Sequence, residues 1–202
     1  MTGQSELNAS VHARKYSGFQ PVAGLVLLTV LGITTLCLRA EGRRWWCRSG
    51  DLLPWSSGIH SGHTSQHFAD PYSFTHVLHG MLFYALLYLV AGRLRWDTRL
   101  VFAVALECVW EVIENSAAVI GRYRQETIAL GYDGDSVLNS LGDIACVVLG
   151  FLMARRLPVR WSIVLFLFID LALLVVYRDN LLFNIIMLVY PSETIKSWQM
   201  GG

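Results

Sequence analysis

Histidines are concentrated in one short part of the chain. Five of the six fall within twenty residues, and these are His60, His63, His67, His76 and His79. His76 and His79 are three residues apart, so on a helix they would share one face. Imidazoles bind zinc and similar ions and also transfer protons near neutral pH. The pattern indicates metal or proton chemistry at His76 and His79, whereas His60 and His63, in a Gly/Ser-rich stretch, are expected to be solvated.

Carboxylates follow on two later apolar segments. Glu107, Glu111 and Glu114 would fall at about 0°, 40° and −20° around a helix that turns 100° per residue, which makes a single stripe. A second stripe, with spacings of four residues, consists of Asp135, Asn139 and Asp143. A carboxylate at membrane depth costs a few kcal/mol. These groups are therefore expected to face one another, a cation or water.

The composition is that of a membrane protein. Of 202 residues, 54% are hydrophobic and only 15% are charged, with a mean hydropathy of +0.45, whereas about a quarter of a soluble domain is charged. The net charge of +1 gives no basic field, so nucleic-acid binding is not expected. Three of the four cysteines lie in apolar runs and Cys47 lies in a loop. No pair has metal-finger spacing, and we expect no disulfide framework; buried thiols of this kind are usually small packing residues.

Five apolar segments approach the roughly 20 residues that a spanning helix needs. They cover about 18–39, 74–92, 99–120, 136–154 and 161–177. We therefore predict an all-α polytopic transmembrane bundle with a single domain over 18–202. A final apolar stretch, Leu181 to Tyr190, is too short to span and is expected to be interfacial or re-entrant.

The remaining segments are expected outside the bilayer core. Residues 1–17 are predicted to form a mobile cytoplasmic segment, and 40–73 a long outward loop. Total arginine and lysine counts on the two sides are equal. The short stretches 93–99 and 155–160 carry three arginines each, which favours a cytoplasmic position for them and for the N-terminus.

Helical rise places the polar residues in the same half of the membrane. At 1.5 Å per residue and a core of ~30 Å, Glu111 and Asp143 would each lie about 12 Å below the outer surface, and His79 about 9 Å. The sequence therefore predicts one outward pocket between the second, third and fourth spans.

Three segments carry a resemblance to a known family. They read SQHFADPYSFTHVLHG (65–80), WEVIENSAAVIGRYRQETIALGYDGDSVLNSLGD (110–143) and RDNLLFNIIMLVYP (178–191). Together they resemble an uncharacterised family of bacterial multi-pass membrane proteins of unknown function. The resemblance covers most of the chain after about residue 40 and implies a bacterial inner-membrane protein.

The resemblance also marks individual positions. The family pattern points to His67, Asp70, His76, His79, Glu111, Glu114, Asn115, Arg122, Arg124, Asp135, Asn139, Asp143, Arg178, Asp179 and Asn180. The order of His, Glu and Asp-x3-Asn-x-x-Gly along successive helices is similar, more loosely, to the VanZ-like group, which is linked with glycopeptide resistance.

An enzyme is the most specific of three interpretations that stay open. Its catalytic groups would be Glu111, Glu114, Asp143 and Asn139. Its metal ligands, for an ion such as zinc, would be His76, His79 and His67. Its phosphate-holding groups would be Arg122, Arg124 and Arg178. The substrate would be a lipid or a lipid-linked molecule.

The other two interpretations need no catalysis. Intramembrane Asp, Glu and His are typical of proton- or ion-coupled transporters. Alternatively, the same residues can hydrogen-bond helix to helix in an assembly factor or complex subunit. All three share the bilayer as partner, and the sequence leaves the oligomeric state open.

Overall fold

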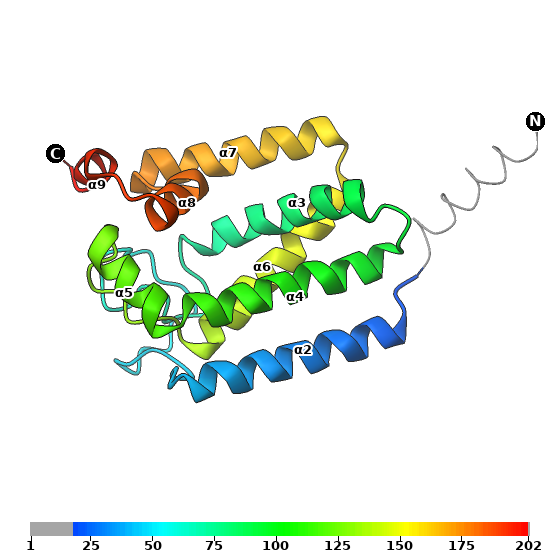
Figure 1. Ribbon diagram of the computed structural model, residues 1–202, viewed down its shortest axis with the longest axis horizontal. Helices are drawn as coiled ribbons and strands as arrows, with labels where there is room; N and C mark the ends of the chain where they lie inside the picture. Colours follow the sequence, from blue (N-terminus) through cyan, green and yellow to red (C-terminus); the bar gives the residue numbers. More distant parts are fainter. Residues whose placement is uncertain (1–17, 202) are drawn as a thin grey trace, which may run out of the picture.

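The computed structural model describes residues 18–201 (Figure 1). Within this range the eight helices are α2 (Pro21–Ala40), α3 (Ser73–Val90), α4 (Trp96–Glu114), α5 (Ala117–Glu126), α6 (Val137–Arg156), α7 (Val159–Tyr177), α8 (Leu181–Val189) and α9 (Glu193–Gln199). The described residues form no β-strand, only an isolated bridge between Trp55 and Ala69. The all-α prediction is confirmed. The mobile cytoplasmic segment predicted for residues 1–17 lies outside the described range.

Four helices are long and apolar enough to cross a membrane, namely α2, α3, α6 and α7. In α7 only Leu173 is buried, while Phe168 and Val175 are about two-thirds or more exposed. A helix that is apolar all round is stable in lipid rather than in water. The remaining predicted span, over 99–120, corresponds in its first part to α4, which has 19 residues but carries five charged ones. The count of five therefore stays a prediction.

Close contact between α3 and α6 forms the centre of the bundle. A Cβ at Gly80 of α3 would overlap the Val147 carbonyl of α6, and one at Gly150 of α6 would overlap the Val77 carbonyl of α3. Glycine lets two helix backbones approach in this way. The hydrophobic core beside this crossing comes from α3, α4 and α6 and includes Leu87, Ala103, Val104, Ile144 and Phe151.

The structure corrects the predicted helix over 99–120. α4 ends at Glu114, and α5 begins at Ala117. Between them Ser116 adopts an extended backbone, and its hydroxyl accepts a hydrogen bond from the Val119 N–H at 3.4 Å. A serine that caps a new helix start satisfies a backbone donor that a continuous helix would bond to a carbonyl. The chain therefore turns at the end of α4 instead of continuing.

The short C-terminal stretch is a separate helix, as its length suggested. Arg178 ends α7 with a left-handed backbone (φ 54°), and the Asn180 side chain caps α8 by accepting from the Phe183 N–H at 2.9 Å. With nine residues, α8 is too short to span. Its interfacial position stays a prediction.

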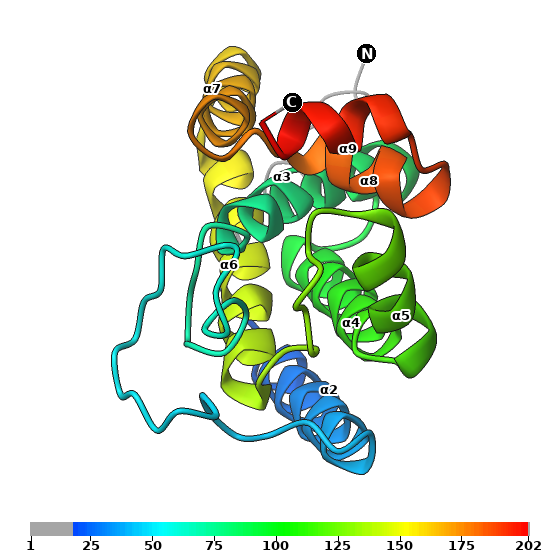
Figure 2. The ribbon, with the colours of Figure 1, turned by 90° about the vertical axis from the view of Figure 1, so that its left-hand side faces the viewer.

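One end of the bundle gathers the non-spanning segments. Residues 41–72, which we call the long loop, lie at this end together with α5, α8 and α9 (Figures 1 and 2). α3 and α6 begin here and α4 ends here. The polar stripes of the three helices are therefore on their parts nearest the long loop.

Candidate functional site

His76, in the first turns of α3, is the centre of the polar cluster. Its Nδ1 lies 2.5 Å from a carboxylate oxygen of Glu107 and 3.7 Å from one of Glu111. Its Nε2 lies 3.8 Å from Asp143 on α6. The ring is buried, and Glu107 and Glu111 have no exposed surface. One imidazole thus faces three carboxylates, which together favour a proton or a metal cation at this point.

Glu107 joins both helical histidines. The His79 Nδ1 also lies 3.3 Å from Glu107, and the two imidazole rings meet edge to face at 5.2 Å. Glu107 was absent from the predicted catalytic and metal-binding residues. The signal that identifies it is its place on the same helical stripe as Glu111 and Glu114.

Glu111 and Asn139 are buried without hydrogen-bond partners for their side chains among the described residues. Among the described residues, neither oxygen of Glu111 has a hydrogen-bond donor, and neither amide atom of Asn139 has a partner. Leaving a buried polar atom unsatisfied costs about 1–3 kcal/mol, and more for a charge. Such atoms in a native fold indicate water, an ion or a bound molecule.

Two groups of side chains at this cluster have metal-ligand spacing. One is His76 with His79 and Glu107, and the other is His76 with Glu111 and Glu114; in each group one donor atom per residue lies within 4.8 Å of the others. Donor atoms of a tetrahedral zinc site lie about 3.3 Å apart. Rotamer adjustments of about an ångström would therefore suffice.

The cluster borders a small cavity of about 110 Å³. Its lining includes His76, His79, Glu114 and Asp143 of α3, α4 and α6. Apolar residues of α8, among them Leu181, Ile185 and Leu188, also line it. The lining is thus partly ionisable and partly apolar.

Two carboxylates at the cavity are oriented by hydroxyl groups. The Ser73 hydroxyl donates to Asp143 at 2.7 Å, and the Tyr123 hydroxyl donates to Glu114 at 2.8 Å. Tyr123 lies on α5, and burial raises the pKa of its phenol well above the usual value, which keeps it a donor. The α4–α5 break therefore brings a donor back over the cluster.

Asp135 links α4 to the start of α6. It accepts hydrogen bonds from the Asn115 amide at 2.8 Å and from the Tyr132 hydroxyl at 2.9 Å, and its own N–H donates to Asn115. Burial raises the pKa of the Asp135 carboxyl. The N-cap of α6 is Ser136, whose hydroxyl accepts a hydrogen bond from the Asn139 N–H.

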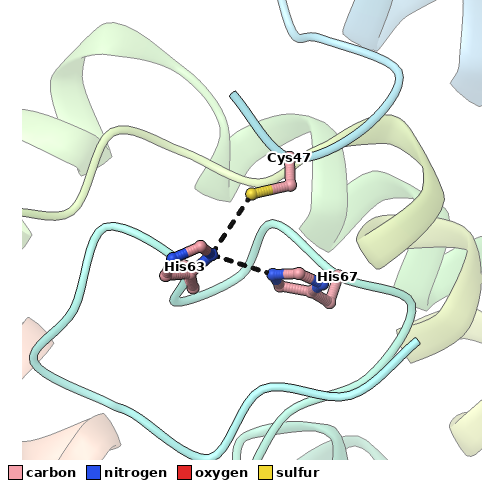
Figure 3. A group of neighbouring side chains, drawn as sticks. All are labelled: Cys47, His63 and His67. Carbon is pink, nitrogen blue, oxygen red and sulfur yellow. Dashed lines mark hydrogen bonds between the residues drawn. The ribbon is translucent and has the colours of Figure 1, made fainter. Parts of the chain in front are cut away.

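The long loop contains two other residues of the family pattern. Asp70 accepts from the backbone N–H groups of Ser65 and Tyr72, each at 2.8 Å, and so shapes the entry into α3. Burial raises the pKa of its carboxyl. His67 contacts Cys47 and His63 in this loop (Figure 3). The prediction had grouped it with His76 and His79, but the structure places it in a different cluster.

The three predicted phosphate-holding arginines bind backbone carbonyls. Arg122 donates to Leu188 and Val189, Arg124 to Tyr132, and Arg178 to Trp198. Arg124 also pairs with Asp133 at 2.5 Å. None of the three is among the described residues that line the cavity. Their part in phosphate binding stays a prediction.

The fold and site together define a class: a helical protein with candidate membrane-spanning helices and a buried histidine–carboxylate cluster beside a small cavity. Residues 38–201 match the family model described as "Protein of unknown function (DUF2585)". The chain belongs to this uncharacterised family.

Relatives in several bacteria carry the name UPF0314 protein. The one from Rhizobium meliloti (strain 1021) is 42% identical and the match covers 88% of this chain and 90% of the relative. The one from Paracoccus denitrificans (strain Pd 1222) is 44% identical over 84% and 88%. The one from Agrobacterium fabrum is 41% identical over 96% of both. No solved structure matches.

Proposed function

We propose that this protein is a membrane-embedded, metal-dependent hydrolase or transferase. It acts on a lipid or lipid-linked substrate at the outer face of the bacterial inner membrane. In this proposal α4 also spans the membrane, which brings the number of spans to five. Its charged residues Glu107 and Glu111 permit this, because both face the bundle interior and are fully buried.

The unpartnered carboxylate of Glu111 is the observation that carries the proposal. Two buried carboxylate oxygens without hydrogen-bond donors, beside His76 and Glu114 at ligand spacing, would be satisfied by a divalent cation. Glu107 would accept the Nδ1–H of His76 and so fix the orientation of the ring. A metal-bound histidine usually has such an acceptor on its other nitrogen.

Asp143 is the group we assign to proton transfer. It lines the cavity, faces the His76 Nε2 and is held by Ser73. A bound divalent ion would supply an activated water or polarise a substrate oxygen. A carboxylate within reach of the same cavity can then take or return a proton. Asn139, one turn earlier on α6, would donate to or accept from bound water.

The cavity favours a substrate with a small polar group on an apolar body. Its volume of about 110 Å³ is small beside the roughly 300–1,000 Å³ of clefts that enclose a drug-sized ligand. Only a polar headgroup would enter, while the apolar side chains of α8 and the neighbouring bilayer would receive the hydrocarbon part.

A structural role is the second candidate. The close His76–Glu107 pair is also what a helix-to-helix bond in an assembly factor would require. A transport path is less supported, because Asp170 of α7 does not extend the cluster: it accepts from the Asn180 side chain and from the Leu181 N–H, and so holds the start of α8.

Metal analysis of purified full-length protein in detergent tests the proposal. Wild type is compared with Glu111→Gln and with Glu193→Gln, which changes an exposed glutamate of α9. We expect Glu111→Gln to lose one equivalent of divalent metal and Glu193→Gln to keep it. Equal metal content in a folded Glu111→Gln protein would contradict the metal assignment and favour the structural role.

A further inference from the structure

A second cluster lies in the long loop, apart from the cavity residues. Cys47 comes from its first part, and His63 and His67 come from its second part (Figure 3). Cys47 and His67 are buried, with 6% and 1% of their surface exposed, and His63 is half-buried. In Figure 3 the thiol and a nitrogen of each ring point toward one another.

The spacing of the three donor atoms is that of ligands around one ion. The Cys47 Sγ lies 3.4 Å from the His63 Nδ1, and this Nδ1 lies 3.1 Å from the His67 Nε2. Zinc bonds of about 2.3 Å to sulfur and 2.0–2.1 Å to nitrogen, at tetrahedral angles, put sulfur and nitrogen about 3.5 Å apart and two nitrogens about 3.3 Å apart. Both observed separations are within a few tenths of an ångström of these values.

A neighbouring carbonyl prepares His67 for metal binding. The His67 Nδ1 donates to the Leu53 carbonyl, which leaves the lone pair of Nε2 directed at His63 and Cys47. A backbone acceptor on the distal nitrogen is the usual arrangement for a metal-bound histidine. The Trp46 ring packs edge-on against His67 at 5.8 Å, and its indole N–H donates to the Asp51 carbonyl. The Leu53 carbonyl and the Trp46 ring therefore both fix the orientation of the His67 ring.

The long loop contains little regular secondary structure that would hold it in place. Over residues 41–72 the structure has no helix, and the Trp55–Ala69 bridge is its one ladder-type pairing. Cys47 is 16 residues from His63, so an ion held by both would close a loop whose ends are otherwise free to separate in the unfolded chain.

We propose that Cys47, His63 and His67 bind one zinc-class divalent cation that fastens the long loop. A thiolate and two neutral imidazoles suit Zn²⁺, which prefers sulfur and nitrogen donors. The fourth position is open to water or to the Ser49 hydroxyl, which lies 3.1 Å from the Cys47 sulfur. The ion would hold the wall of the cavity, because Thr64 and Ser65, between the two histidines, line it.

Metal binding to stripped full-length protein in detergent tests this site directly. After chelation, Co²⁺ alone is added as a spectroscopic probe, and then Zn²⁺ alone. We expect a thiolate-to-cobalt charge-transfer band that Zn²⁺ removes. The membrane cluster contains only nitrogen and oxygen donors, so it cannot give this band. The double variant His76→Gln/Glu111→Gln should therefore retain it, which separates this site from the proposed function.

Variants identify the ligands. We expect Cys47→Ser to abolish the band, and His63→Gln and His67→Gln to weaken Zn²⁺ binding at least about tenfold, the smallest loss typical of even a supporting partner. Cys37→Ser and His60→Gln are the matched controls and should bind as wild type does.

Thiol protection gives a readout that does not depend on the variants folding. In wild type, alkylation of Cys47 is mapped by mass spectrometry with and without Zn²⁺. We expect at least tenfold slower alkylation when Zn²⁺ is present. Equal alkylation rates in the two conditions, or a Zn²⁺ affinity unchanged by Cys47→Ser, would overturn the proposal.

Discussion

Glu111 shows how a single buried side chain decides between catalytic and structural interpretations. Its carboxylate is fully buried with no donor among the described residues. If this carboxylate binds a cation, Glu111→Gln weakens metal binding. If the carboxylate binds no cation, Glu111→Gln removes the cost of burying it and stabilises the fold. The sign of one substitution therefore distinguishes the two.

Metal binding at the Glu111 cluster should be visible as a rise in Tm. We expect the Tm of Cys47→Ser protein to rise on addition of Zn²⁺ or Mn²⁺, because a ligand that binds only the folded state stabilises that state. The Cys47→Ser background removes the loop site from the measurement. Adding Glu111→Gln should abolish most of this rise, while adding Glu193→Gln should leave it. A rise that survives Glu111→Gln would contradict the assigned ligands. Thermal unfolding in detergent is the measurement.

Asp179 predicts a pH dependence of stability. Burial raises the pKa of this carboxyl to about 6, even though Tyr72, Asn180 and Gln199 donate hydrogen bonds to it. Because its folded pKa lies above its unfolded one, folding favours the protonated form. Its contribution is complete below about pH 4 and is lost as the pH rises toward 6.

The variant Asp179→Asn isolates this effect. We expect it to remove the pH-dependent loss, which amounts to roughly 2 kcal/mol between pH 4 and pH 7. Wild type should therefore lose stability relative to Asp179→Asn across this window in denaturant titrations. A constant difference between the two proteins would show that Asp179 titrates at its ordinary pKa.

At the scale of the elements, the α3–α6 crossing makes a sharp prediction. Gly150→Ala places a Cβ against the Val77 carbonyl, where backbone must move. We expect about 1–3 kcal/mol of destabilisation from overpacking. Gly32→Ala in α2 has no atom within 4 Å of the new Cβ and should be neutral or stabilising by up to about 1 kcal/mol. Thermal unfolding of the two variants in one detergent checks the contrast.

Element identity was largely predictable from the sequence, and so, to within three residues, were the ends of α2, α3, α6 and α7; the end of α4 was not. Long apolar runs set α2, α3, α6 and α7 because a bilayer requires helices of that length. The end of α4 was missed because its apolar pattern continues past Asn115. The deciding feature was the Ser116 cap together with the return of α5 toward Glu114, which is a tertiary contact.

At the scale of the whole molecule, five spans with a cytoplasmic N-terminus predict which loops face outward. Leu52 in the long loop is highly exposed, and Leu94 lies in the α3–α4 connection at the other end of the bundle. We expect a membrane-impermeant thiol reagent to label Leu52→Cys in intact cells with a permeable outer membrane. Leu94→Cys should be labelled only after the inner membrane is opened. The reverse pattern would invert the topology, and labelling of both from outside would mean an even number of crossings between them.

The two clusters lie toward the same end of the molecule. α3 and α6 begin at the loop end of the bundle and α4 ends there, and His76, Asp143 and Glu111 lie within two turns of these helix ends. The loop that carries His63 and His67 also supplies Thr64 and Ser65 to the cavity. The long loop therefore forms part of the wall of the cavity as well as carrying the second cluster.

The sequence by itself determined the helical membrane architecture and the presence of polar stripes on three helices, because hydrophobic length and helical periodicity are local properties. Only the tertiary structure decided which groups meet. Glu107 reaches His76 across 31 positions of the chain. His67 leaves the helical histidines for Cys47 and His63, because the path of an irregular loop follows from its contacts rather than from any period. The chemistry of this protein therefore depends on pairings that the spacing of residues could suggest but not assign.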